Sequence, residues 1–492
     1  MTVTPHTASK RDLRFVIIGA GMAGLLAGLK LQSSGTQSFT IYEKGATVGG
    51  TWRENRYPGL TCDVPAHAYT YSFEPNPDWS RFYAPGPEIQ RYFETVVDRH
   101  KLRNRIRFNT EVTGCHWDGL RWRLTTAGGG EDVADVLIAA TGVLHHPNIP
   151  AILGLECFAG ETLHSARWND DVVVDGRRLG VIGNGSTGVQ IVVALAERAR
   201  ELVHFQRSPQ WIMPVNDFAY SDEEREAFRE DQARIDAIRF GEDYWSGIRR
   251  FNEAIIEPDS PAMKEIERIV LENLERNVAD PALREQLRPD YKPACKRLVY
   301  SPSYYQAVQK PGVRVERDRI AQVERSGVRM EHGGIHPLDV LVLATGFQTD
   351  RFVRPIKIEG RNHATLDEAW RVRPTAYYAI SIPDFPNFFM LNGPTAPVGN
   401  FSLIDIAEKQ WAYIEQLLAP LRDGRATSVS ARHDALAEYE SRRIAKARTT
   451  VFGSGCTSWY LDAEGVPQTW PWTYDQFADA MLQPDMAAYD IR

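Results

Sequence analysis

Two glycine-rich turns carry residue types and spacings that can bind the phosphates of a nucleotide. In the first turn, Gly19, Gly21 and Gly24 follow the apolar run RFVII and precede a segment with helical spacing. In such a strand–turn–helix unit the first glycine allows a tight turn and the second lets backbone N–H groups approach a pyrophosphate. The third glycine lets helix and strand pack closely, and the helix N-terminus favours the negative charge. The sequence therefore predicts a dinucleotide site at this turn.

An acidic residue follows the first turn at a spacing that suits a ribose. Glu43 ends the β-rich run FTIYEK, nineteen residues after Gly24. A carboxylate at this position can accept hydrogen bonds from both hydroxyls of an adenosine ribose. We therefore expect the first site to bind FAD, with NAD as the alternative.

The second turn repeats the pattern with the opposite charge at its end. It follows RLGVI and consists of Gly183, Gly185, Ser186, Thr187 and Gly188, with one residue between the first two glycines. The next run, ELVHFQ, ends at Arg207, again nineteen residues after the third glycine. A carboxylate there would repel a 2′-phosphate, whereas a guanidinium can bind one through two hydrogen bonds. We expect NADPH in preference to NADH, and an ordinary strand-end charge is the alternative interpretation of Arg207.

An internal sequence repeat supports the presence of two related nucleotide-binding units. The runs DVLIAATG (135–142) and DVLVLATG (339–346) are near copies. Each is typical of a buried strand that ends in a turn of small residues, where the backbone can come close to a cofactor. We expect each run to close one of the two nucleotide-binding units.

With these elements in place, the chain resembles the class B flavoprotein monooxygenases and, among them, the Baeyer–Villiger monooxygenases. The segments GGTW (49–52) and YPGLTCDVPAHAYTYSFEPNPDWS (57–80) resemble that family's flavin-site segment. The stretch FAGETLHSARWN (158–169) resembles its fingerprint F-x-G-x-x-x-H-x-x-x-W-[P/D]. The matching residues are Phe158, Gly160, His164 and Trp168, and the last position holds Asn169.

The resemblance also separates two branches of the class. Sister enzymes that oxidise nitrogen or sulfur usually carry another aromatic residue where this chain has Trp168, so the tryptophan favours the Baeyer–Villiger branch. Asn169 departs from the family's Pro or Asp. We expect His164 to be a hydrogen-bonded structural histidine in a linker between the two units, with no part in proton transfer.

The resemblance implies an NADPH- and FAD-dependent enzyme that converts a ketone and O2 into an ester or lactone through a C4a-peroxyflavin. Such an oxygen species must stay anionic and be shielded from water, which requires a fixed cation in a closed site. By position, Arg297 in YKPACKRLVYSPSYYQAV is that cation, beside the flavin. Asp63 in CDVP is the aspartate that orients Arg297 and balances its charge. Arginine suits this role because it stays protonated at any working pH.

The same alignment assigns further cofactor contacts. Lys296 should join Arg207 on the 2′-phosphate, and Ser208 should add a hydrogen bond. Positions expected at the FAD are Thr51, Trp52, Asp63 and Tyr69 near the flavin, Val112 at the adenine and Leu403 at the pyrimidine edge. A helix N-terminus at Leu403 would stabilise the negative charge of reduced flavin. Trp459, in a tail rich in Trp and Pro, could contact NADPH or substrate or simply pack.

Length and pattern predict an α/β protein with two Rossmann-like dinucleotide-binding domains, for FAD and NADP, in a glutathione-reductase-like arrangement. The 492 residues are 43% hydrophobic and 25% charged, an ordinary globular balance. Charged, helix-forming runs without strand signals predict a helical insertion. The predicted parts are 1–146 (FAD domain), 147–212 (NADP domain), 213–295 (insertion), 296–349 (NADP domain) and 350–492 (FAD domain and tail).

Composition argues against several classes of protein. A formal net charge of −7 leaves no basic excess for nucleic acid. The five cysteines include no C-x-x-C pair, which excludes a thioredoxin-type dithiol and a cysteine-based zinc site; we expect no metal. An odd, sparse set of cysteines suits a reducing compartment better than a disulfide scaffold. The N-terminus lacks a signal-peptide core, and the run FVIIGAGMAGLLAGL contains four glycines and is too short for a membrane segment. We expect a cytoplasmic protein.

Three rival functions remain at this stage. The nearest is a monooxygenase of the same class that oxidises sulfur or nitrogen, against which Trp168, Asp63 and Arg297 argue. A non-catalytic nucleotide-binding regulator would need neither Asp63 nor Arg297. A flavin reductase without oxygenase chemistry lacks a redox-active cysteine pair here. The physiological ketone and the oligomeric state stay open.

Overall fold

The computed structural model describes residues 11–397, 399 and 401–492, and a parallel sheet forms the centre of each of its two nucleotide-binding units. The first sheet contains, in spatial order, β19 (Phe388–Met390), β7 (Val136–Ala139), β1 (Phe15–Ile18), β2 (Phe39–Tyr42) and β3 (Ile106–Arg107). Each residue of β1 and β7 is buried, as expected for parallel strands covered on both faces. Because β19 lies at one edge, the last third of the chain returns to this sheet.

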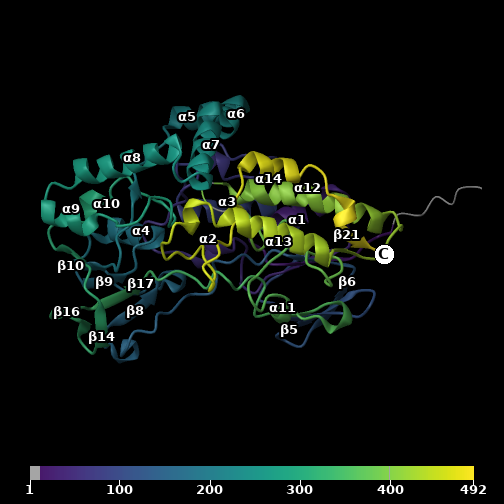
Figure 1. Ribbon diagram of the computed structural model, residues 1–492, viewed down its shortest axis with the longest axis horizontal. Helices are drawn as coiled ribbons and strands as arrows, with labels where there is room; N and C mark the ends of the chain where they lie inside the picture. Colours follow the sequence, from purple (N-terminus) through teal and green to yellow (C-terminus); the bar gives the residue numbers. More distant parts are fainter. Residues whose placement is uncertain (1–10, 398, 400) are drawn as a thin grey trace, which may run out of the picture.

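The second sheet has five parallel strands. They are β13 (Val313–Glu316), β10 (Glu201–Phe205), β9 (Arg178–Ile182), β17 (Val340–Leu343) and β8 (Glu161–His164). The two repeated runs form β7 and β17. Each lies beside the strand that precedes the glycine turn of its unit: β7 pairs with β1, and β17 pairs with β9. Figure 1 shows this second sheet and its helices at one end of the long axis.

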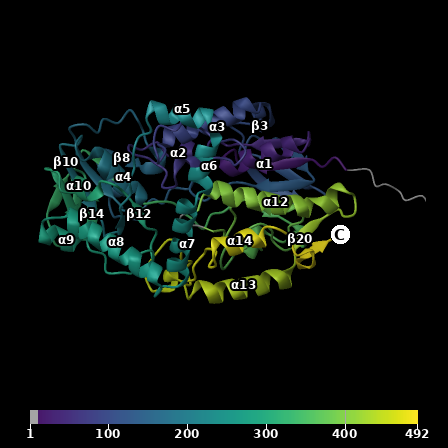
Figure 2. The same cartoon turned by 90° about the horizontal axis from the view of Figure 1, so that it is seen from above.

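A helix follows each glycine turn, as the two motifs predict. These helices are α1 (Met22–Ser33) and α4 (Ser186–Leu195). The long helix α12 (Leu403–Arg422) packs against α1, and α3 (Gly86–Arg99) also belongs to the core around the first sheet. Figure 2 shows α12 running beside α1. The fold is therefore α/β with two Rossmann-like units, as predicted.

Two smaller sheets accompany the parallel ones. The first consists of β18 (Lys357–Glu359), β4 (Val112–Trp117), β5 (Trp122–Thr126) and β6 (Glu131–Ala134). The second is the meander of β14 (Ile320–Glu324), β15 (Gly327–Met330) and β16 (Ile335–Pro337). Trp117 and Trp122 from the first of them pack with Phe388 and cover one face of the first parallel sheet.

The helical insertion connects the two halves of the second unit. Its helices are α5 (Asp222–Glu230), α6 (Gln232–Phe240), α7 (Glu242–Ile256), α8 (Pro261–Asn277) and α9 (Pro281–Leu287). Ser221 and Glu224 form a capping box at the start of α5, and Ser260 caps α8 ahead of a proline. The short strands β11 (Ile212–Met213) and β12 (Val299–Tyr300) pair in parallel, so the insertion starts and ends side by side. The numerical domain bounds stay a prediction.

The C-terminal part adds α13 (His433–Ala447), α14 (Tyr474–Ala480) and the antiparallel pair β20 (Val429–Ala431) and β21 (Tyr489–Ile491). The short helices are α2 (Thr51–Glu54), α10 (Tyr304–Ala307), α11 (Leu366–Ala369), η1 (Ala66–Ala68), η2 (Leu102–Arg105), η3 (Leu155–Cys157), η4 (Ser165–Arg167), η5 (Arg361–His363), η6 (Val451–Gly453) and η7 (Met486–Ala488). Within the described residues, no helix has both the length and the apolar character needed to cross a bilayer.

Candidate active site

The first glycine turn has the close backbone packing that its sequence predicts. Gly19 has a φ of +103°, and a Cβ there would lie 2.5 Å from the carbonyl oxygen of Ala140, in the first Ala-Thr-Gly run. A Cβ on Gly24 would lie 1.9 Å from the carbonyl oxygen of Gly19. Gly21 caps the N-terminus of α1 without a side-chain cap, so the first N–H groups of the helix remain available to an anion.

The second turn repeats this geometry almost atom for atom. Gly183 has a φ of +108°, and its added Cβ would lie 2.3 Å from the carbonyl oxygen of Ala344 in the second Ala-Thr-Gly run. A Cβ on Gly188 would lie 1.9 Å from the oxygen of Gly183. A Cβ on Gly185 would meet no heavy atom of the described residues within 4 Å. The second glycine therefore faces open space, where a pyrophosphate can approach the N–H groups of Ser186 and Thr187 at the start of α4.

The carboxylate predicted to bind the ribose is buried and held from three sides. Glu43 is 4% exposed, and its oxygens accept hydrogen bonds from the N–H groups of Ala20 and Gly45 at 2.9 and 2.7 Å. Arg53 forms an ion pair with it at 2.8 Å. Because each carboxylate oxygen can accept two hydrogen bonds, Glu43 retains capacity for a ribose hydroxyl. The start of β4 at Val112 lies close by, since Thr110 N–H donates to the Glu43 carbonyl at 2.9 Å.

Three residues predicted to bind the 2′-phosphate gather at the end of β10. The ammonium of Lys296 donates to the hydroxyl of Ser208 at 3.0 Å and lies 4.2 Å from the centre of the Tyr291 ring. Burial lowers the pKa of Lys296, and the nearby cation of Arg207 lowers it further. Lys296 and Arg207 repel each other when no anion is bound. A dianionic phosphate beside them would offset this repulsion and could also bind the Ser208 hydroxyl.

The residues predicted to lie near the flavin form an aromatic corner. Trp52 on α2 donates its indole N–H to the hydroxyl of Tyr69 at 3.1 Å, and the two rings meet edge to face. Thr51 begins the same short helix. Burial raises the pKa of Tyr69, so its phenol stays neutral. This corner supplies apolar surface and few charges, which suits a flat ring system.

Asp63 and Arg297, 234 residues apart in the chain, form an ion pair between the two units. The guanidinium Nη2 lies 2.6 Å from Asp63 Oδ2, and Nη1 donates to the carbonyl oxygen of Gly399 at 2.9 Å. Burial favours a lower pKa for Arg297, but the charge of Asp63 and its hydrogen bond to the guanidinium outweigh burial and raise the pKa above its usual value, and the nearby phenol of Tyr460 acts in the same direction. The cation is therefore permanent.

The N-terminus of α12 lies near this ion pair, since Gly399 precedes it by only four residues. Leu403 is the first residue of the helix, and its carbonyl accepts a hydrogen bond from the Asn392 amide at 3.2 Å. Ser402 makes no side-chain cap, and its buried hydroxyl has no partner among the described residues. The first N–H groups of α12 are thus free for an anionic or carbonyl partner.

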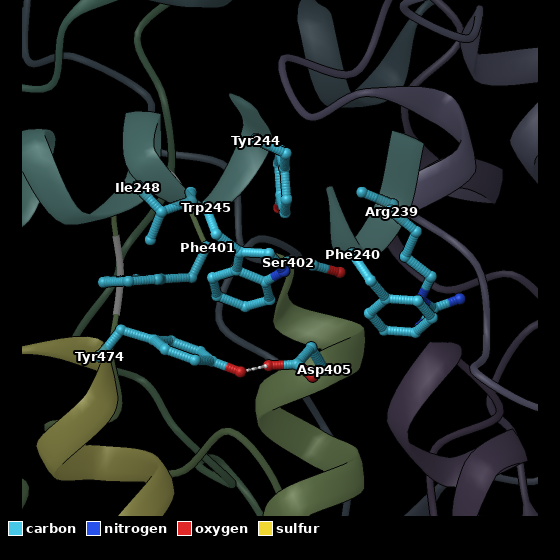
Figure 3. A pocket seen from close by; sticks show the side chains of 10 residues that line it. Arg239, Phe240, Tyr244, Trp245, Ile248, Phe401, Ser402, Asp405 and Tyr474 are labelled. Carbon is cyan, nitrogen blue, oxygen red and sulfur yellow. Dashed lines mark hydrogen bonds between the residues drawn. The ribbon is translucent and has the colours of Figure 1, made fainter. Parts of the chain in front are cut away.

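A small cavity, with aromatic side chains at half of its lining positions, lies between the helical insertion and the start of α12, as Figure 3 shows. Its lining residues are Ala68, Arg239, Phe240, Tyr244, Trp245, Ile248, Phe401, Ser402, Asp405 and Tyr474. Tyr474 donates its hydroxyl proton to Asp405 across the cavity. Arg239 is 6% exposed and donates to Thr70 and to the carbonyl of Tyr71. The insertion therefore contributes one wall of this pocket.

The fingerprint stretch belongs to the second sheet. His164 ends the edge strand β8, and its Nδ1 accepts a hydrogen bond from the Ala166 N–H at 3.1 Å. Burial lowers the pKa of His164, which keeps the ring neutral. A Cβ on Gly160 would lie 2.3 Å from a backbone oxygen, and Trp168 is buried in the core of the second unit. The predicted structural role of His164 agrees with this environment.

One pair of cysteines is joined, which the sequence did not indicate. The sparse, odd set favoured a reducing compartment over a disulfide scaffold, yet Cys295 and Cys456, 161 positions apart in the chain, form a disulfide with a Cα–Cα distance of 6.2 Å. Cys62, Cys115 and Cys157 are free. The sequence could not reveal the pair, because the fold brings the tail against the turn that precedes Lys296. The chain has no C-x-x-C motif, so the bond is not a redox pair of that type.

Three further residues of the site region were not predictable from residue type. Gly399 contributes only a backbone oxygen, and a backbone acceptor has no signature in the sequence. Tyr460 is one of nineteen tyrosines, so its type alone does not single it out. Arg53 reaches Glu43 from a helix that the motif assigned to the flavin. Trp459, for which the sequence left contact with a ligand or plain packing open, is 48% exposed. Its ring lies against that of Tyr460, with ring centres 4.1 Å apart.

Comparison with known proteins places these features in a family. The family model described as pyridine nucleotide-disulphide oxidoreductase matches residues 16–238. An uncharacterized monooxygenase of Mycobacterium tuberculosis is 41% identical over 97% of this chain and 95% of its own length. A Baeyer–Villiger monooxygenase of Streptomyces coelicolor is 36% identical over 99% and 94%. The crystal structure of cyclohexanone monooxygenase from Rhodococcus sp. Phi1 bound to NADP+ superposes with a TM-score of 0.87 at 29% identity, covering 98% and 99%.

Identity at this level over nearly the whole of both chains, together with the paired glycine turns and the Asp63–Arg297 contact, establishes the family. The cradles at α1 and α4 and the cation pair at the end of β10 fit FAD and NADPH. The chain belongs to the Baeyer–Villiger monooxygenases and is an FAD- and NADPH-dependent monooxygenase.

Proposed function

We propose that Arg297 and Asp63 form the reaction centre that inserts one oxygen atom beside the carbonyl of a ketone. The observation that carries this proposal is the 2.6 Å ion pair, which spans the two nucleotide-binding units. FAD, once reduced by NADPH, supplies the activated oxygen when it is bound. Arg297 provides the positive charge that this oxygen and the negatively charged oxygen of the attacked carbonyl need.

The partners of Arg297 orient the charge. Asp63 and the carbonyl of Gly399 each bind a different terminal nitrogen of the guanidinium, so they fix the plane of the group. A planar donor held at two points needs little reorganisation when negative charge develops beside it. Asp63 also offsets part of the cost of keeping a cation in a half-buried site.

The assignments for NADPH rest on the cation pair. Arg207 and Lys296 supply charge, and Ser208 supplies a hydroxyl, for the 2′-phosphate that distinguishes NADPH from NADH. The turn at Gly183, Gly185 and Gly188 binds the pyrophosphate. The equivalent turn at Gly19, Gly21 and Gly24 binds that of FAD, with Glu43 at the ribose, Val112 at the adenine and Leu403 at the pyrimidine edge.

The lining of the cavity in Figure 3 supports a proposal for the substrate class. Aromatic and aliphatic side chains form most of its lining, so an apolar ketone gains more from burial there than a charged one. Ser402 and the free N–H groups of α12 lie at one side of this cavity. We infer that the organic substrate is a ketone with an apolar body.

Labelled oxygen tests the proposal. The purified enzyme receives NADPH, ¹⁸O2 and a panel of cyclic and open-chain ketones, and mass spectrometry identifies the products. The proposal expects one labelled atom in an ester or lactone. A thioether in the same panel tests the rival: efficient sulfoxide formation with no ester from any ketone would replace the proposed function by sulfur oxidation. A protein that consumes NADPH and forms neither product would be a reductase.

A cytoplasmic location is the remaining part of the proposal. Three of the five cysteines, Cys62, Cys115 and Cys157, are free thiols, which supports this location, whereas the Cys295–Cys456 disulfide is of a kind more common in an oxidising compartment. Fractionation of cells that carry the gene tests this location. Recovery of the protein with the cytoplasmic fraction is expected, and its recovery outside the cell would contradict the proposal.

A further inference from the structure

We propose that Gln190 is a positioning residue for Asp63, and that through Asp63 it positions the Arg297 guanidinium. This inference rests on the proposed function of the ion pair and extends it to helix α4, whose N-terminus is assigned to the pyrophosphate of NADPH. The term bridging turn is used below for residues 57–63, which follow α2 and end at Asp63. Gln190 thereby joins the predicted NADPH site to the ion pair.

The bridging turn follows a helix of the first unit in the chain but packs into the second unit. Tyr57 is 6% exposed and belongs to the hydrophobic core around the second sheet. Gly59 has a φ of +82°, and a Cβ there would lie 2.6 Å from the backbone carbonyl oxygen of Gln190. Any side chain at this position would push the turn away from α4. The backbone of the bridging turn therefore lies directly against the helix that follows the second glycine motif.

The side-chain amide of Gln190 uses both of its ends on the bridging turn. Its Oε1 accepts a hydrogen bond from the Tyr57 hydroxyl at 2.9 Å. Its Nε2 donates to the carbonyl oxygen and to the hydroxyl of Thr61, each at 3.1 Å. Because three atoms of two residues hold the plane of the amide, Thr61 is fixed relative to α4. Asp63 follows Thr61 by two residues, so the same contacts restrain the backbone that carries its carboxylate.

The bridging turn is also attached to the first unit. The Cys62 N–H donates to the carbonyl oxygen of Ala84 at 3.0 Å, just before α3. Both units therefore hold the backbone that carries Asp63, while Arg297 comes from the second unit. The distance between the two charged groups depends on how the units are joined at this turn. Gln190 makes the join from the side of the second unit.

The same contacts reach the turn assigned to NADPH. The Tyr57 hydroxyl also donates to Thr187 Oγ1 at 3.3 Å, and Thr187 belongs to the first turn of α4. Because it accepts this hydrogen bond, the Thr187 hydroxyl keeps its own proton for another partner, such as a phosphate oxygen. Both N–H groups of the Gln190 amide, in contrast, are occupied by Thr61. The amide therefore restrains the bridging turn and has no donor left for a phosphate.

Arginine labelling tests the positioning role in the FAD-loaded enzyme. Phenylglyoxal modifies arginines that are free to react, and peptide mass spectrometry reports the rate at each arginine. Gln190→Met keeps the length of the side chain and removes its hydrogen bonds, so we expect labelling of Arg297 about five-fold faster than in the wild type. Arg443, which is fully buried and paired with Glu440 at 2.8 Å, is the internal reference for general loosening, and its rate should not change.

Titration with NADP+ separates positioning from damage to α4. Because the Gln190 amide has no free donor and the glycine turn is untouched, Gln190→Met should bind NADP+ with the affinity of the wild type. A larger share of NADPH electrons should nevertheless appear as hydrogen peroxide instead of ester, since the charge of Arg297 is less well placed. A loss of NADP+ affinity as large as the gain in labelling would indicate a distorted helix and would overturn the positioning role.

A second glutamine of the same unit provides the matched control. Gln309 donates to the carbonyl oxygens of Asn277 and Tyr305 at 2.7 Å, between α8 and α10. Gln309→Met also removes two hydrogen bonds and should leave the labelling of Arg297 unchanged. Equal acceleration in the two variants, or a wild-type rate in Gln190→Met, would overturn the inference.

The outcomes distinguish this inference from the proposed function. A wild-type enzyme that forms no ester, yet shows labelling of Arg297 that depends on Gln190, would refute the proposed function and leave the positioning role intact. Ester formation by the wild type together with unchanged labelling in Gln190→Met would do the reverse.

Discussion

Among single residues, Arg297 bears most directly on the chemistry, because its charge is permanent and its orientation is held by Asp63 at 2.6 Å. Arg297→Ala should still oxidise NADPH, since the residues at the 2′-phosphate are untouched. Its rate of ester formation should fall at least about 100-fold, the usual loss when one charge-stabilising donor is removed from an active site. Product chromatography beside NADPH absorbance measures both rates.

Arg297→Lys serves as the control for charge alone. It keeps a cation but cannot bind Asp63 and the Gly399 carbonyl with two nitrogens of one rigid plane. An intermediate rate is expected. A normal ester yield from Arg297→Ala would show that the charge beside the oxygen comes from another group.

Arg207 should determine the choice between the two nicotinamide cofactors. Arg207→Ala removes one of the two cations at the end of β10, so we expect the KM for NADPH to rise about 10- to 100-fold. The KM for NADH should barely change, because NADH has no 2′-phosphate. Steady-state kinetics with both cofactors measure the ratio, with Lys310→Ala, at a surface ion pair of the same unit, as control. An unchanged NADPH/NADH ratio would refute the assignment.

Site residues differ in how far the sequence could reveal them. Arg207 was predicted from its spacing after the second glycine turn, whereas Lys296 and Ser208, which lie 3.0 Å apart, were predicted from family resemblance. Asp63 and Arg297 were predicted from family resemblance. The Gly399 carbonyl was not, since only the fold brings a backbone oxygen to a side chain more than a hundred residues away.

At the scale of elements, two glycines of the second turn separate an effect on packing from an effect on binding. Gly188→Ala places a Cβ 1.9 Å from the Gly183 oxygen, so α4 must shift and the unfolding temperature should fall by several degrees. Gly185→Ala meets no neighbour within 4 Å among the described residues, so the fold should survive. Its methyl group faces the predicted pyrophosphate, and the KM for NADPH should rise. Thermal denaturation and kinetics measure the two effects. Equal losses of stability in both variants would contradict the contrast.

The edge strand β8 shows why some elements are hard to predict. The fingerprint 158–169 was expected as a linker between the units, yet Glu161–His164 pairs with β17. Only two of the four residues of β8 are buried, so its pattern is too weak to indicate a strand. Pairing with the buried strand Val340–Leu343 stabilises the extended conformation. The strands β7 and β17, in contrast, could be predicted from the repeated sequence because each is a continuous run of apolar residues.

At the scale of the whole molecule, the two nucleotide units contact each other around one side chain of α4. Gln190 accepts a hydrogen bond from Tyr57 at 2.9 Å and donates to the Thr61 carbonyl at 3.1 Å, so the segment before Asp63 is attached to the second unit. The Asp63–Arg297 pair crosses the same boundary. The sequence could assign residues to each unit, but this contact depends on how the units pack.

Cofactors should stabilise the whole chain by mass action. A ligand at 1,000 times its Kd adds about 4 kcal/mol to the free energy of unfolding of the part that binds it. FAD should therefore raise the unfolding temperature, and NADP+ should raise it further. NADP+ should have the same effect in Arg297→Ala, because its phosphate is assigned to Arg207 and Lys296. Calorimetry with each ligand measures this, and loss of the NADP+ effect in Arg297→Ala would contradict the assignment.

The central claim is that the guanidinium of Arg297 faces the flavin while Asp63 holds it. A crystal structure of the enzyme with FAD and NADP+ bound tests this claim most directly. We expect the guanidinium beside the isoalloxazine, within about 4 Å of the ring or of an oxygen species on it, in at least one captured state. A guanidinium directed into bulk solvent in every state would contradict the account.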